Sequence, residues 1–190
     1  MEMERDTSVI KDRDIRIPIT WQVILVCVLA FIGGGLGGYF VHGGYWSAAQ
    51  GAILFAVSAY AAMVDFKLKL VPDWIHFVIA SAALPLLIHA IMLQDWSKLI
   101  AMGLGMVVVP LPLLLSMFMT KNGIGGADIK IMVAIGLNLG IIGGFISLIL
   151  GLLLAIIING VMIATKKKDK KTSFAFVPYI AIASMAAFFF

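Results

Sequence analysis

The feature that most constrains this chain is a succession of long apolar segments separated by short polar links. Each segment holds about 20 residues, and a helix of that length spans the roughly 30 Å of hydrocarbon in a bilayer. The chain is 62% hydrophobic and only 13% charged, whereas a soluble domain is about 45–50% apolar. The sequence therefore predicts an all-α, polytopic membrane protein. The clearest spans are residues 21–41, 46–64, 74–93 and 99–119.

Residues 129–164 form one apolar run that is too long for a single ordinary span. A break near residues 140–144 would divide it into two helices, and residues 174–190 would add a short last span. With about seven spans, thirteen of the fourteen Lys and Arg residues fall on one side, and only Lys98 falls opposite. Basic residues favour the cytoplasmic side. We therefore predict seven transmembrane helices, with the N-terminus in the cytoplasm and the C-terminus outside.

This topology divides the chain into a cytoplasmic tail (1–20), an extra N-terminal transmembrane helix (21–42) and a six-helix membrane domain (46–190). Glycines within residues 33–38 would let a neighbouring helix approach the first span closely. The net charge of +4 is explained by orientation in the membrane. The lipid bilayer is therefore the expected partner, and nucleic acid is not.

Neither a metal nor a cofactor is predicted. The single cysteine, Cys27, lies in an apolar segment, so the chain cannot form an internal disulfide or a cysteine-based zinc site. His76 and His89 also lie in apolar segments, without the neighbouring acids or cysteines that a metal site would need. We interpret both histidines as packed polar residues.

Asp65, Asp73 and Asp128 lie at or near the ends of predicted spans on the cytoplasmic side. An ionisable residue at the membrane edge costs enough free energy to be a functional candidate. Two carboxyl groups held close together share a proton, because both cannot ionise easily. One can then activate water while the other protonates a peptide carbonyl. We expect Asp65 and Asp128 to form such an aspartic-protease dyad.

Structural roles compete with this interpretation. An Asp that precedes a helix, as Asp128 does, is often an N-cap, and Asp65 could be an interfacial charge beside Lys67. Asp73 follows Pro72 and is expected mainly to cap the third span. If the dyad exists, Asp128 lies at a helix N-terminus and Asp65 at a C-terminus. The helix dipoles then predict that Asp128 holds more of the negative charge.

Three ordered motifs lie at the ends of predicted spans: Asp65 with Val71-Pro72-Asp73, the run Gly125-Gly126-Ala127-Asp128-Ile129-Lys130, and residues 174–179. Together they resemble motifs of the type IV prepilin peptidase family, which includes archaeal preflagellin peptidases. Asp65 followed by Val71-Pro72-Asp73 is similar to the family's Asp and Ile/Val-Pro-Asn/Asp pair. The run Gly125-Gly126-Ala127-Asp128-Ile129-Lys130 resembles its Gly-x-Gly-Asp-hydrophobic-Lys element. Residues 174–179, Phe-Ala-Phe-Val-Pro-Tyr, resemble the start of its last helix. The similarity extends from about residue 46 to the C-terminus.

The resemblance implies a plasma-membrane aspartic endopeptidase that removes a short basic leader from prepilin-like or preflagellin-like precursors, as in type IV pilus assembly or protein secretion. It also implies catalytic Asp65 and Asp128. Ala127 stands where the family has a second glycine. The paired Cys-x-x-Cys motifs of its bifunctional members are absent, so no methyltransferase activity is expected. The implied substrate-binding or supporting residues are Gly125, Gly126, Ala127, Lys130, Pro72 and Asp73.

Three alternatives remain open. Carboxylates on glycine-interrupted helices also serve as proton or cation sites in transporters, although those sites usually lie near the midplane on internal repeats. Ala127 leaves room for a catalytically inactive relative that acts as a membrane scaffold. An intramembrane aspartic protease of the presenilin type would share the Gly-x-Gly-Asp element. That type is expected to have more helices and an Asp deeper in a span.

Overall fold

The computed structural model describes residues 20–68, 71–119, 125–165 and 175–190. The N-terminal tail (1–19) and the lysine cluster at 166–171, which contribute to the predicted topology, lie outside these ranges. Within them the regular elements are helices alone, as predicted. They are α2 (Trp21–His42), α3 (Tyr45–Leu68), α4 (Asp73–Ser81), α5 (Leu84–Met92), α6 (Trp96–Val108), α7 (Leu111–Met119), α8 (Gly126–Ala164) and α9 (Val177–Ala187).

Five helical stretches of the described chain are long and apolar enough to cross a membrane. Two of them are each made of two separate helices: α4 and α5 together make the span Asp73–Met92, and α6 and α7 make Trp96–Met119. Pro85 follows the first break, and Pro110 lies in the second. Proline interrupts a helix because it lacks a backbone N–H. With the shorter apolar helix α9, these stretches confirm an all-α, multi-pass membrane protein.

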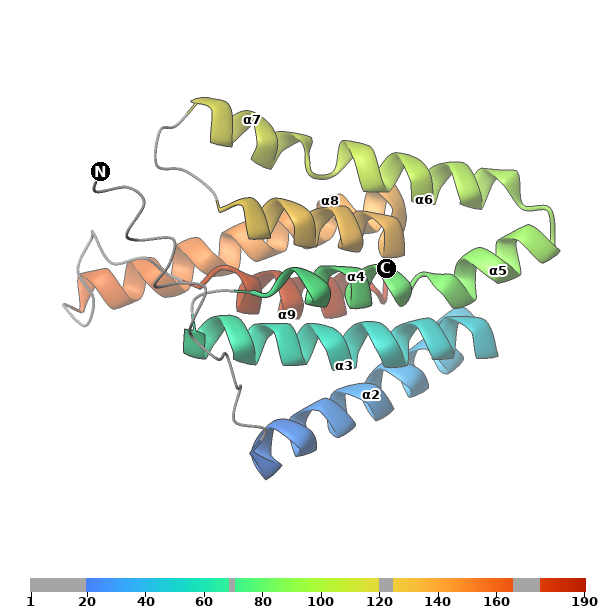
Figure 1. Ribbon diagram of the computed structural model, residues 1–190, viewed down its shortest axis with the longest axis horizontal. Helices are drawn as coiled ribbons and strands as arrows, with labels where there is room; N and C mark the ends of the chain where they lie inside the picture. The colour runs from blue at the N-terminus through green and yellow to red at the C-terminus, as the bar shows by residue number, and fades with distance from the viewer. Residues whose placement is uncertain (1–19, 69–70, 120–124, 166–174) are drawn as a thin grey trace, which may run out of the picture.

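The longest helix, α8, folds back on itself at Gly140. This residue has φ 69° and ψ −165° inside the 39-residue helix, in the region that glycine adopts readily. A Cβ built on Gly144 would lie 3.4 Å from the Cα of Gly136, whereas a straight helix separates these residues by about 12 Å along its axis. Figure 1 shows the two halves running in opposite directions. The predicted break near residues 140–144 is confirmed.

Counting the halves of α8 separately, the described chain contains seven apolar helical segments that alternate in direction. The C-terminal end of α3 and the N-terminal ends of α4, α8 and α9 therefore gather at one end of the molecule, at the left of Figure 1. These are the helix ends that carry Asp65, Asp73 and Asp128.

Glycines set the two closest helix crossings. A Cβ on Gly34 would collide with the carbonyl of Gly51, and one on Gly38 with the carbonyl of Ser47, so α2 and α3 pack backbone to backbone. A Cβ on Gly105 would likewise collide with the carbonyl of Gly136, where α6 crosses α8. Small residues permit such crossings in lipid, where helix association depends on close packing. The close approach predicted for residues 33–38 is confirmed.

Two buried polar side chains stabilise the helix breaks. Gln50 and Asn138 are only 2% and 3% exposed. The Gln50 Nε2 donates to the backbone oxygen of Asn138 at 2.7 Å, next to the interruption at Gly140. The Asn138 Nδ2 donates to the carbonyls of Ile79 at 2.8 Å and Ala134 at 2.9 Å. Carbonyls near helix ends lack regular partners, so these amides tie α3, α4 and α8 together where the helices are interrupted.

We predict that Asn138→Leu destabilises the protein by about 1–3 kcal/mol, because it leaves buried polar groups without partners. The free energy of unfolding would be measured by denaturant titration in detergent. Gln50→Leu removes the other member of the network. Because the Gln50 Nε2 also donates to the Asn138 Oδ1 at 3.4 Å, the cost of the double variant should be smaller than the sum of the single costs. Strictly additive costs would contradict a shared network.

Candidate active site

Asp65 lies near the C-terminal end of α3 and is 6% exposed. Its Oδ2 accepts a hydrogen bond of 3.1 Å from the backbone N–H of Val177, and the N–H of Phe176 is a second donor to the carboxylate. Both donors belong to the start of α9, where N–H groups have no partner within the helix. Asp65 is therefore a buried acceptor for the last helix, rather than an interfacial charge beside Lys67.

Asp128 is the third residue of α8 and is partly buried. Its carboxylate accepts a hydrogen bond from the N–H of Gly125, the N-cap residue of α8. A carboxylate at the third helical position that reaches back to the N-cap N–H forms the acidic half of a capping box. Asp128 is therefore not the N-cap considered from the sequence, because Gly125 takes that position, but its bond to Gly125 holds the side chain at the helix start.

The fold places Asp65 and Asp128 at the same end of the bundle. Their carboxyl groups lie close enough to interact electrostatically, although they come from the end of α3 and the start of α8. The Asp65 carboxylate also lies at the N-terminus of α9, through its bond to Val177. Both carboxylates therefore face a helix N-terminus, where an anion is favoured. The dipole argument for placing more charge on Asp128 loses its basis, because it considered only the helix to which each residue belongs.

Asp73 and Lys130 form an ion pair between α4 and α8, with 2.6 Å from Nζ to Oδ1. Their side chains are 71% and 56% exposed. The expected capping role of Asp73 is wrong: the N-cap position of α4 is Pro72, which provides no side-chain cap, and Asp73 is the first helical residue. Its carboxylate instead pairs with Lys130, which lies two residues after Asp128.

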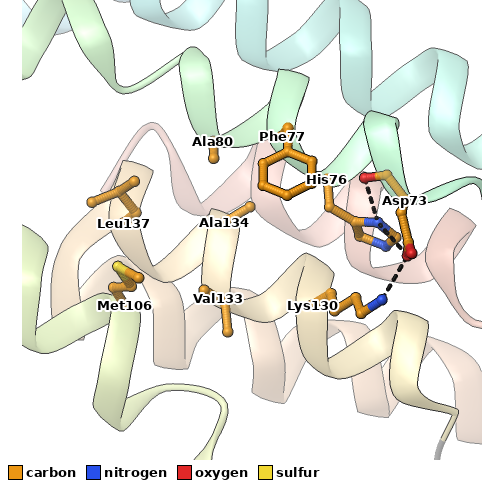
Figure 2. Close-up of a pocket in the computed structure, with 9 residues that line it drawn as sticks. All are labelled: Asp73, His76, Phe77, Ala80, Met106, Lys130, Val133, Ala134 and Leu137. Carbon is orange, nitrogen blue, oxygen red and sulfur yellow. Dashed lines mark hydrogen bonds and ion pairs between the residues drawn. The ribbon is translucent and has the colours of Figure 1, made fainter.

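A cavity of about 480 Å³ begins beside this ion pair, between α4, α6 and α8. Figure 2 shows Asp73, His76 and Lys130 grouped at one end of it. Lys130 is two residues from Asp128, which places it about 200° around a helix. Asp128 therefore points away from the cavity. The other lining residues are Phe77, Ala80, Met106, Val133, Ala134 and Leu137.

Ala127, which stands where the motif has a glycine, lies in the first turn of α8. Among the described residues other than glycine, only Gln94 has a positive φ, so the backbone at Ala127 does not require glycine. Alanine is in fact the better helix former. Gly125 and Gly126 are exposed at the start of the same helix, and a Cβ on Gly126 would meet nothing within 4 Å.

The histidines differ in their surroundings. The ring of His89 stacks on Trp46 with 5.7 Å between centroids, as expected for a packed polar residue. His76 contacts two backbone carbonyls, those of Asp73 and Ala127. The sequence offered no signal for these contacts except that His76 lies one helical turn after Asp73. In the part of the chain that the structure describes, no three His, Cys, Asp or Glu side chains gather as a metal site would require.

Comparison with known proteins identifies the family. A sequence model of the type IV leader peptidase family matches residues 52–164, a range that includes Asp65, Asp73 and Asp128 and leaves out α2 and α9. No curated protein matches the chain, and no solved structure does. Because the match extends over more than half of the sequence, the chain belongs to the type IV leader peptidase family.

Proposed function

We propose that this protein is a membrane aspartic endopeptidase that removes a short basic leader from prepilin-like or preflagellin-like precursors at the cytoplasmic membrane boundary. The observation that carries the proposal is the convergence of Asp65 and Asp128 within electrostatic reach of each other. They meet where α3 ends and α8 and α9 begin. Membership of a family of leader peptidases supports the same reaction class.

The chemistry requires one ionised and one protonated carboxyl group. The ionised Asp takes a proton from a water molecule as the water oxygen bonds to the scissile carbonyl carbon. The protonated Asp gives its proton to the carbonyl oxygen, which produces a neutral tetrahedral intermediate. When the carbon–nitrogen bond breaks, the departing amine receives a proton from the dyad. Backbone donors at Val177 and Gly125 hold the two carboxylates in place for these transfers.

The proposed orientation places the N-terminus and the dyad in or facing the cytoplasm. The seven alternating segments support it, because the sequence segments that hold thirteen of the fourteen basic residues all begin or end at helix ends on the side of Asp65 and Asp128. In such a precursor, the boundary between the basic cytoplasmic leader and the apolar membrane helix would lie at the same membrane depth as Asp65 and Asp128. We also propose that residues 46–190 form the peptidase domain and 21–42 an addition to it, since the family match begins after α2.

Asp73 is a weak candidate for binding the basic leader. Its carboxylate already pairs with Lys130, so a leader lysine would have to displace an existing cation. The Asp73–Lys130 ion pair instead connects α4 to the first turns of α8. The acids of the N-terminal tail, Glu2, Glu4, Asp6, Asp12 and Asp14, remain the other candidates for that contact.

We predict that Asp65→Asn and Asp128→Asn each lower cleavage by at least about 10²–10⁴-fold, the contribution of a general acid or base. Leader removal would be measured by mass spectrometry after co-expression with a candidate prepilin. Asp95→Asn is the matched control, because that carboxylate is exposed and accepts a bond from the Lys98 N–H at 3.1 Å as the cap of α6. Cleavage retained in either dyad variant would overturn the proposal.

The inactive-scaffold alternative rests on Ala127. Because the helical backbone at this position suits alanine, we predict that Ala127→Gly changes the cleavage rate little. It should lower the free energy of unfolding by at most about 1 kcal/mol, the difference in helix propensity between the two residues. Parallel cleavage and unfolding measurements test this. A large gain in cleavage would show that alanine impairs the site.

A further inference from the structure

We propose that His76 is a positioning residue for the dyad. Together with the Asp73–Lys130 ion pair, its imidazole fixes the rotation of the first turn of α8 and so aims Asp128 at Asp65. The inference rests on the proposed catalytic role of Asp128. It gives Asp73, His76 and Lys130, which lie at one end of the cavity in Figure 2, an indirect part in the reaction. These residues line the cavity and do not face the dyad.

The contacts of His76 join α4 to the residue before Asp128. The side chain is buried, with the whole residue 6% exposed. Its Nδ1 lies 3.2 Å from the backbone oxygen of Asp73, and its Nε2 lies 3.2 Å from the backbone oxygen of Ala127. Lys130, on the following turn of α8, reaches back to the Asp73 carboxylate at 2.6 Å. One turn of α4 thus contacts the first turns of α8 at two residues, Ala127 and Lys130.

Both ring nitrogens of His76 face acceptors. A neutral imidazole has a single N–H, and a carbonyl oxygen can only accept, so both contacts are hydrogen bonds only when the ring carries both protons. The Asp73 Oδ1 lies 3.9 Å from Nδ1. The imidazole therefore bridges α4 and the start of α8 through its two nitrogens. The other charged groups on the adjoining elements are Lys130 and Asp128 on α8 and Asp65 and Lys67 on α3.

The apolar face of α8 is buried from Ile129 onward, whereas the glycines at the helix start are open to solvent. Gly125 and Gly126 are exposed, and no neighbouring atom lies within 4 Å of where a Cβ on Gly126 would be. A side-chain tip lies about 5–6 Å from a helix axis, so a rotation of about 10° moves it by about 1 Å. A misplacement of that size can cost about 100-fold in rate.

Cross-linking tests the positioning without any need for activity. In a Cys27→Ala background, Asp65→Cys and Asp128→Cys are introduced together, and the rate of disulfide formation is measured under mild oxidant. We expect His76→Phe, which keeps a ring but loses both nitrogen contacts, to slow cross-linking severalfold. His89→Phe is the matched control, since that histidine stacks on Trp46 and should leave the rate unchanged. An equal rate with and without His76→Phe would overturn the inference.

Kinetics separate positioning from folding. His76→Phe should lower kcat by about 100-fold with little change in KM. His76→Gln, which retains a hydrogen-bond donor, should have a kcat between those of His76→Phe and the wild type. Thermal melting identifies any variant that fails to fold. If His76→Phe fails to fold, His76→Gln replaces it in both the cross-linking and the kinetic assay. Loss of activity through instability alone, with normal cross-linking, would contradict positioning. Cleavage retained by Asp128→Asn would instead refute the proposed function.

Discussion

The structure depends on a carboxylate that is almost completely buried and satisfied from the other end of the chain. Asp65 ends α3 and accepts hydrogen bonds from the first turn of α9, a helix that lies 112 residues further along the sequence. Burying a charge without such partners would be strongly unfavourable. The bond therefore requires α3 and α9 to lie side by side, and it brings the start of α8 and Asp128 to the same end of the bundle.

A second requirement comes from the bilayer, which supplies no water to hydrogen-bond free backbone groups. The chain breaks its helices at Gly140 and between α4 and α5. The amides of Gln50 and Asn138 bond to carbonyls beside those breaks. Glycine crossings bring the helices near enough for these bonds to form. The breaks thus shape the bundle while the carbonyls beside them keep hydrogen-bond partners, and the two halves of α8 lie in opposite directions.

Much of this arrangement could be predicted from the sequence, because it follows from length, apolarity and charge. The spans, the break in the 129–164 run and the gathering of three Asp residues at one end all follow from those quantities. The individual hydrogen bonds between distant segments could not be predicted. No local pattern reveals that Asp65 bonds to Val177 or that His76 contacts the Ala127 carbonyl. The capping role expected for Asp73 was wrong because a local rule took no account of Lys130 on α8.

The central claim is that Asp65 and Asp128 act as one coupled pair, and infrared titration tests it most directly. The carboxyl stretching bands of the purified protein would be followed against pH in the wild type, Asp65→Asn and Asp128→Asn. A coupled pair titrates jointly, so replacing either residue should shift the titration midpoint of the other. If each carboxyl group titrates at the same pH whether or not its partner is present, the two residues act independently and the dyad does not exist.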